Sequence, residues 1–172
     1  MAHARSTRAS ALPRCSRNGT RRSARIAWTA RVPVSPSVLR RIHHVGVVVT
    51  KLDDALKFWR DALGLRVTRT ATIEDQGVRA ALLDAGNSEI ELLEPIDPSG
   101  GVAKFLARRG GGLHHICFET EDVAAELDAA RAKGIQLIDQ QPRRGLAGMI
   151  CFLHPKAARG VLVEYAQPID AE

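Results

Sequence analysis

The order of apolar and polar residues repeats once along the chain. An apolar run typical of a buried strand begins the first copy at Ile42–Val49, and a similar run begins the second at Leu113–Glu119. In each copy, apolar residues at helical spacing and then short runs between turn residues follow, which predict one helix and three further strands. The pattern therefore predicts two tandem βαβββ modules, at about residues 42–97 and 112–168.

The boundaries of the expected elements follow from caps, turns and periodicity. The first module has a helix begun by Asp53 as N-cap and strands at Arg66–Thr72, Val78–Asp84 and Glu89–Leu93. A short helix from about Val102 to Arg108 connects the modules, and the second module has a helix at Val123–Lys133 capped by Asp122, then strands near Gln136–Asp139, Met149–Leu153 and Val161–Tyr165. One module cannot cover both faces of its sheet, so we expect an α+β fold in which the two pair about a pseudo-twofold axis, with a curved mixed sheet around a groove.

A histidine near the start and a glutamate near the end of each module have matched spacing. His44 precedes Glu91 by 47 positions, and His115 precedes Glu164 by 49. Two imidazoles and two carboxylates brought together by the duplication form a ligand set suited to a divalent first-row metal such as cobalt, nickel, manganese or zinc. The spacing therefore predicts a four-ligand metal site between the modules.

Each of these histidines belongs to a His-His pair. Because side chains alternate between the faces of a strand, we expect only one of His43 and His44 to point inward, and likewise only one of His114 and His115. Periodicity alone does not choose between them.

Charge is distributed unevenly along the 172 residues. Ten of the 25 Lys and Arg residues precede Ile42, whereas all 19 Asp and Glu residues follow it, so the chain from Ile42 onward has 15 basic and 19 acidic residues and a net charge of −4. This balance disfavours nucleic-acid binding by the folded part. No apolar run approaches the ~20 residues that a membrane-spanning helix needs.

Residues 1–39 are rich in Arg, Ser and Ala and contain no acidic residue, a composition typical of a disordered tail. It also fits an organellar transit peptide or an extension from an upstream start codon. The domain is then expected at residues 40–172. The odd cysteine count, with Cys117 and Cys151 inside apolar runs, favours reduced thiols and a cytoplasmic location, with the mitochondrial matrix as the alternative if the tail is a transit peptide.

Four stretches of the sequence resemble a known family. They are IHHVGVVV from Ile42, DQGVRAALLDAGNSEIELLEP from Asp75, GGLHHICFET from Gly111 and FLHPKAARGVLVEYAQ from Phe152. The duplicated plan resembles the vicinal oxygen chelate superfamily, and the stretches closely resemble its methylmalonyl-CoA epimerase family. The likeness covers about residues 42–167.

The resemblance implies a metal-dependent epimerase that interconverts (R)- and (S)-methylmalonyl-CoA through abstraction of the α-proton and a metal-stabilised enolate. It implies that the second histidine of each pair is a ligand, so that His44, Glu91, His115 and Glu164 hold the ion. Cobalt is expected, with manganese, nickel and zinc as alternatives. Glu164 and Glu91 are the expected acid and base groups, and a homodimer is the expected assembly.

One departure leaves the second base open. Some members of the family have a Glu three residues after the glycine of the Gln-Gly turn, where this chain has Ala80. Glu74 and Asp75 are acidic neighbours of that turn. Lys156, in the His-Pro-Lys turn, is interpreted either as a cation for an acidic substrate or as a solvated turn residue.

Two other functions compete with the epimerase. A glyoxalase I type lyase also uses two His and two Glu, although glyoxalase-like chains usually have an Asp-Pro-Asp-Gly type of turn where this chain has His-Pro-Lys. A non-catalytic binding protein of the same fold commonly lacks the ligand set, and the presence of all four candidates disfavours it.

Overall fold

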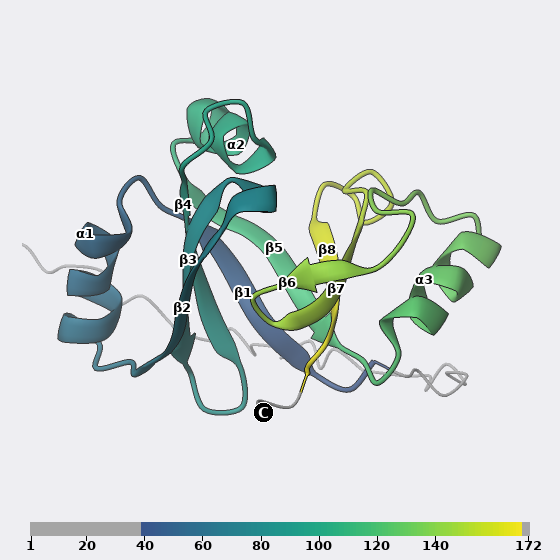
Figure 1. Ribbon diagram of the computed structural model, residues 1–172, viewed down its shortest axis with the longest axis horizontal. Helices are drawn as coiled ribbons and strands as arrows, with labels where there is room; N and C mark the ends of the chain where they lie inside the picture. The colour runs from purple at the N-terminus through teal and green to yellow at the C-terminus, as the bar shows by residue number, and fades with distance from the viewer. Residues whose placement is uncertain (1–38, 170–172) are drawn as a thin grey trace, which may run out of the picture. The chain divides into compact units, whose positions relative to one another are not determined.

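The computed structural model describes residues 39–169, which fold around one eight-stranded mixed sheet (Figure 1). The strands are β1 (Ile42–Val48), β2 (Val67–Ile73), β3 (Val78–Asp84), β4 (Glu89–Pro95), β5 (Gly112–Glu119), β6 (Arg143–Gly145), β7 (Gly148–Leu153) and β8 (Leu162–Gln167). The helices are α1 (Leu52–Leu56), which continues as the π-helical turn η1 (Lys57–Ala62), the 3-10 turn η2 (Glu74–Gln76), α2 (Gly101–Arg109) and α3 (Val123–Ala132).

The sheet has the duplicated topology that the sequence predicts. Its order is β2-β3-β4-β1-β5-β8-β7-β6, with the first module on one side and the second on the other. In each module the first strand pairs in parallel with the last, β1 with β4 and β5 with β8, and antiparallel pairing of β1 with β5 joins the modules. The predicted fold class, two βαβββ modules in one curved mixed sheet, is confirmed.

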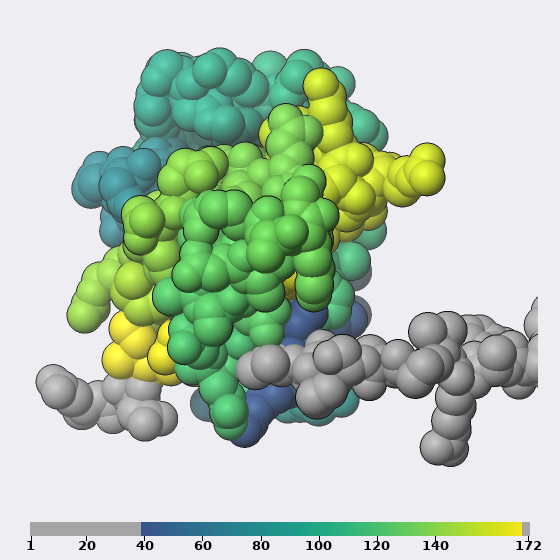
Figure 2. Space-filling model, turned by 90° about the vertical axis from the view of Figure 1, so that its right-hand side faces the viewer, coloured from purple at the N-terminus to yellow at the C-terminus, as the bar shows by residue number. Residues whose placement is uncertain are grey.

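The outer face of each module is covered by its own helix (Figure 1). Leu52 and Leu56 of α1 pack on Leu83 and Leu92 of the first module. On the other side, α3 packs on β7 and β8, and Figure 2 shows it lying over this flank of the second module. The two apolar clusters leave the opposite face of each module free to form the groove.

The ends of the sheet curve toward one another across that groove. The turn between β6 and β7 places Leu146 in the same apolar cluster as Ala80 and Leu82 of β3. The guanidinium of Arg69 on β2 donates a hydrogen bond of 2.6 Å to the carbonyl of Leu146. The second module therefore contributes directly to the core of the first.

The start of the first helix differs from the expectation. Lys51 is the N-cap and offers no side-chain cap, whereas Asp53 lies in the first turn and forms an ion pair with Arg79. The backbone N–H of Leu52 instead donates to the carboxylate of Glu94 on β4, at 2.9 Å. A long-range acceptor thus replaces the local cap, whereas Asp122 caps α3 as predicted by accepting from the N–H of Ala125.

The prediction of a strand near Gln136–Asp139 is also wrong. This stretch makes a single bridge, between Leu137 and Leu153, and the edge strand is β6 at Arg143–Gly145. The side chain of Asp139 accepts a hydrogen bond from the N–H of Phe152 at 2.8 Å, a position that a carbonyl would occupy in a regular ladder. The Asp139 side chain therefore takes the place of strand pairing here.

The predicted tail, residues 1–39, lies outside the described residues except for its last position. Among residues 39–169, no helix is long and apolar enough to cross a membrane.

Replacing Glu94 tests the long-range cap on the first helix. Glu94→Met removes the acceptor and leaves the buried N–H of Leu52 without a partner, so we expect the free energy of unfolding to fall by about 1–3 kcal/mol. Glu94→Gln keeps an acceptor oxygen and serves as the matched control. Urea unfolding followed by circular dichroism measures both, and equal stabilities for the two variants would contradict the assignment.

Candidate metal centre and active site

Four neighbouring strands at the centre of the sheet each supply one predicted ligand. His44 lies on β1, Glu91 on β4, His115 on β5 and Glu164 on β8, and these strands are consecutive in the order β4-β1-β5-β8. All four side chains are buried, with relative exposures of 1%, 6%, 4% and 3%. The structure therefore brings the four predicted residues together inside the sheet's groove.

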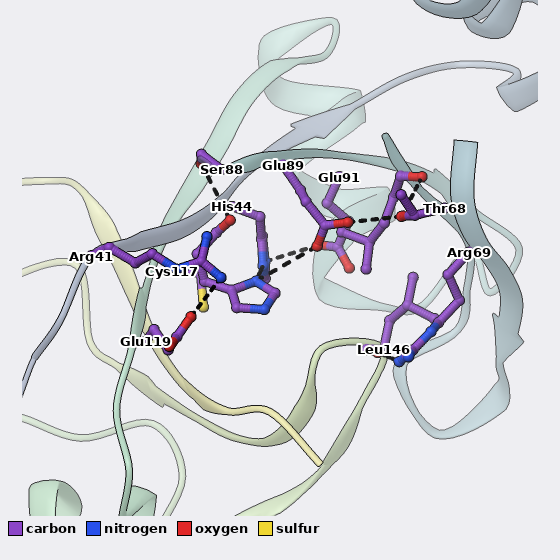
Figure 3. A network of polar contacts seen from close by, with 12 residues as sticks. Arg41, His44, Thr68, Arg69, Ser88, Glu89, Glu91, Cys117, Glu119 and Leu146 are labelled. Carbon is purple, nitrogen blue, oxygen red and sulfur yellow. Dashed lines mark hydrogen bonds and ion pairs between the residues drawn. The ribbon is translucent and has the colours of Figure 1, made fainter. Parts of the chain in front are cut away.

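The facing atoms of these side chains gather around the two imidazole Nε2 atoms, and His44, Glu91 and His115 each offer a ligand atom within 4.8 Å of the others. The Nε2 atoms of His44 and His115 lie 3.0 Å apart. His44 Nε2 is 3.5 Å from Glu91 Oε2 and 3.3 Å from Glu164 Oε2, and His115 Nε2 is 3.4 and 3.0 Å from the same two oxygens. Figure 3 shows His44 and Glu91 side by side, between the Arg41–Glu119 ion pair and the Arg69–Leu146 contact.

These distances fit a metal ion. Nitrogen and oxygen ligands bind first-row ions at ~2.0–2.2 Å, so two ligand atoms of one ion lie ~3.0 Å apart at a right angle and ~3.4 Å apart at the tetrahedral angle. The observed distances of 3.0 to 3.5 Å cover this interval. The donor set, two imidazoles and two carboxylates without a thiolate, suits a divalent ion of intermediate hardness.

The electrostatics of the cluster favour positive charge between the two carboxylates. Burial lowers the pKa of His115, but its contacts with Glu164 and Glu91 outweigh burial and raise the pKa well above its usual value. Burial raises the pKa of Glu164, but its contacts with His115 and His44 outweigh burial and lower the pKa. Both shifts arise because two buried carboxylates stabilise positive charge between them, and a divalent ion supplies that charge at the same point.

A glycine makes room for one of the imidazoles. Gly46 of β1 lies directly opposite His115 of β5, and a Cβ atom at Gly46 would stand 2.2 Å from Cε1 of that ring. The glycine was not among the predicted site residues. Its position inside the β-branched run Ile42–Val49 is the signal that could have found it, since a glycine within a strand often marks a close approach.

The expectation that only one histidine of each pair turns inward is wrong for the second pair, because His114 and His115 both line the same hollow. His44 and His115 face the carboxylates, and the rings of His43 and His114 turn toward these two neighbouring imidazoles. Nδ1 of His43 lies 3.0 Å from Nδ1 of His44, and Nδ1 of His114 lies 3.0 Å from Nδ1 of His115. Burial is the main cause that lowers the pKa of His43, and it lowers that of His114 to about 4, so both rings are neutral at pH 7.

A groove of about 340 Å³ opens onto the cluster, and we call it the active-site groove. Glu91, His115 and Glu164 form part of its wall, together with His114, Phe152 and Arg143, whose guanidinium stands 5.4 Å from the centre of the Phe152 ring. Gln76 also lines it, and its Nε2 is buried without a hydrogen-bond partner among residues 39–169.

A second hollow of about 520 Å³, which we call the basic hollow, continues from the active-site groove. The two share Gly101, His114, Ile138 and Leu162. Arg108, Arg109 and His154 line the basic hollow, so positive charge gathers on one side of the metal cluster.

The remaining candidate residues differ in whether they reach the active-site groove. Ala80 is fully buried on β3, and Asp75 lines the active-site groove, whereas Glu74 is exposed and lines none of the hollows described here. Lys156 is exposed and also lines none of them, which favours its interpretation as a solvated turn residue. Cys117 and Cys151 are buried free thiols whose pKa values burial raises, consistent with inert packing.

A sequence profile of the Glyoxalase/Bleomycin resistance protein/Dioxygenase superfamily matches residues 43–152. The chain is 35% identical to the mitochondrial methylmalonyl-CoA epimerase of Mus musculus over 131 residues, which cover 75% of this chain and 74% of that protein. It is also 35% identical to the ethylmalonyl-CoA/methylmalonyl-CoA epimerase of Cereibacter sphaeroides over 133 residues, 76% of this chain and 99% of that protein. The chain belongs to the methylmalonyl-CoA epimerase family of this superfamily.

A solved structure of the family has the same fold. A variant of the Streptomyces coelicolor methylmalonyl-CoA epimerase, in complex with 2-nitronate-propionyl-CoA, is 42% identical and superimposes with a TM-score of 0.73. The match covers 78% of this chain and 98% of that one. The family fold therefore extends over nearly all of the described residues.

Replacing Gly46 tests whether the close approach to His115 matters for the metal centre. Gly46→Ala places a methyl group against the imidazole, so we expect the His115 ring to be displaced and the affinity for Co²⁺ to fall by at least ~10-fold, the lower end of the effect of misorienting a ligand. Gly101→Ala is the control, because a Cβ there meets nothing within 4 Å. Titration of the metal-stripped proteins with Co²⁺ measures both affinities, and equal values would refute the role of Gly46.

Proposed function

We propose that the chain is an epimerase that interconverts (R)- and (S)-methylmalonyl-CoA, and that His44, Glu91, His115 and Glu164 hold its divalent metal ion. The observation that carries the proposal is the convergence of these four buried side chains, from both modules of a family member, on one point at the wall of a groove. Co²⁺ is the ion we expect.

The reaction needs stabilisation of negative charge. The proton on the α-carbon between a thioester and a carboxylate is a weak acid, and its removal develops charge on the thioester oxygen. A bound divalent ion supplies Lewis-acid stabilisation for that charge. His115 and Glu164 are buried, and electrostatic interactions are stronger at a buried site than in water.

Inversion also needs two proton-transfer groups, one for each face of the α-carbon. Glu91 and Glu164 are suited to these roles because they come from opposite modules yet line the same groove. A carboxylate held by a cation is a weak base, so either residue must loosen its hold when it accepts the proton. Asp75, which lines the same groove, is the remaining acidic candidate, since Ala80 carries no acid.

The charge around the groove favours an acyl-CoA substrate. Arg143 lines the active-site groove, where its guanidinium, whose Nε donates to Asp139 at 3.2 Å, can meet the free carboxylate of the acyl group with its other nitrogens. Arg108 and Arg109 line the adjoining basic hollow, where they can meet the phosphates of CoA. A glutathione hemithioacetal, the substrate of a glyoxalase I type lyase, has no phosphate for that hollow.

Deuterium exchange tests the function. With one epimer of methylmalonyl-CoA in deuterated water, we expect the pure protein to incorporate deuterium at the α-position and to form the other epimer, and a chelator to stop both reactions. NMR and chiral analysis of the acyl group measure the two outcomes. Turnover of a glutathione hemithioacetal without exchange would instead identify a lyase, and binding without exchange would identify a binding protein.

Glu164→Gln separates proton transfer from metal binding. The amide keeps an oxygen for the ion but cannot accept the α-proton, so we expect retained Co²⁺ binding and a loss of epimerisation of at least ~10²-fold. Exchange of the α-proton should stop for at least one epimer. Glu121→Gln, at an exposed position, is the control. If metal-loaded Glu164→Gln instead exchanged the α-proton of both epimers at the wild-type rate, Glu164 would be a metal ligand only.

Assembly and location remain predictions from the sequence. We expect the protein to form a homodimer. Light scattering at micromolar concentration would measure its mass, and the mass of a monomer would contradict the expectation.

We expect the protein to be located in the cytoplasm, or in the mitochondrial matrix if residues 1–39 act as a transit peptide. Cell fractionation would distinguish the two locations.

A further inference from the structure

The first histidine of each His-His pair is the extra residue of a β-bulge. Between β1 and β5, Ile42 faces Phe118 and His44 faces Cys117, so His43 has no partner of its own. Further along the same ladder, Gly46 faces His115 and Val47 faces Leu113, so His114 is the extra residue on β5. A bulge changes the direction of the side chains around it, and here it occurs at the equivalent position of both modules.

The two bulges bring the same pair of atoms together. Nδ1 of His43 meets Nδ1 of His44 at 3.0 Å, and Nδ1 of His114 meets Nδ1 of His115 at 3.0 Å. Within residues 39–169, Nδ1 of His44 and Nδ1 of His115 have no other hydrogen-bond partner. The Nε2 atoms of these two rings are the ones that face Glu91 and Glu164.

Hydrogen-bond chemistry then fixes which nitrogen carries each proton. A neutral imidazole that offers the lone pair of Nε2 to a metal carries its hydrogen on Nδ1 and must donate it. The neighbouring Nδ1 must therefore accept, which requires its own ring to carry its hydrogen on Nε2. The arrangement is consistent only if the first histidine of each pair is a neutral acceptor.

We infer that His43 and His114 are positioning residues that accept the Nδ1–H of His44 and His115 and thereby fix the tautomer and rotation of the two ligand rings. The inference rests on the proposed metal centre and adds the two residues that hold its histidine ligands in place. The two acceptors differ in surroundings, since His114 packs edge-on against Phe105 and lines the active-site groove, whereas His43 does not line it. His43 therefore offers the cleaner test, because its replacement does not alter the groove wall.

The test compares two residues of the same shape at position 43. Asparagine carries an acceptor oxygen on Cγ, where histidine carries Nδ1, and leucine has the same branched outline without an acceptor. We expect His43→Leu to weaken Co²⁺ binding by ~10–100-fold, the typical effect of losing a partner of a metal-bound histidine, and to change the visible absorption of the bound Co²⁺. We expect His43→Asn to stay within a few-fold of the wild-type protein in affinity and to keep its spectrum.

The measurement is a Co²⁺ titration of the metal-stripped protein against a competing chelator, without substrate, on variants whose circular dichroism shows a folded domain. Equal losses for both variants would assign His43 a packing role, and no loss in either would remove it from the metal centre; both results overturn the inference. His114→Leu and His114→Asn repeat the comparison in the second module and decide the matter if His43→Leu does not fold. A wild-type protein that binds no Co²⁺ would instead refute the proposed function itself.

Discussion

Two carboxylates buried against two imidazoles are the constraint on which the structure depends. Glu91 and Glu164 are less than one-tenth exposed, and buried charge is unfavourable unless an opposite charge is close. Each module supplies one imidazole and one carboxylate, and each carboxylate lies within 3.5 Å of both imidazoles. The antiparallel pairing of β1 with β5 brings the two sets together, so the proposed metal centre lies at the sheet's central junction.

The outer parts of the fold maintain this junction. The helices α1 and α3 cover the outer faces of the two modules with separate apolar clusters, which leaves the inner faces to curve around the site. The Arg69–Leu146 hydrogen bond and the shared cluster around Ala80 connect the far ends of the sheet. Curvature is therefore set by contacts at the rim of the groove as well as by the twist of the strands.

Duplication is the reason that so much of the site could be predicted from the sequence. His44, Glu91, His115 and Glu164 have matched spacings, and a repeated fold converts matched spacing into matched position. The bulges at His43 and His114 could not be predicted, because one extra residue in a ladder depends on the partner strand and has no residue type of its own.

The missing strand near Asp139 has a similar cause. The sequence gives a strand-like pattern, but the Asp139 side chain accepts the N–H of Phe152, and nothing local distinguishes such a residue from a strand residue. The cap of α1 was missed for the same physical reason. Its acceptor, Glu94, is 42 positions away in the sequence, and Asp53 was the better local candidate.

The proposed metal centre is nearly symmetric, but its surroundings are not, and inversion of a carbon atom needs both properties. Symmetry provides two equivalent carboxylates, Glu91 and Glu164, that approach one point from opposite modules. Asymmetry provides one space for the substrate. Glu91 and Glu164 both line the active-site groove, whereas neither lines the hollow of about 160 Å³ beside His43. The positive side chains Arg108, Arg109 and Arg143 lie on the groove's side as well. In the proposed function, a substrate held there by its anionic groups would present a single α-carbon to both carboxylates, which is the arrangement that removal of a proton from one face and its return to the other requires.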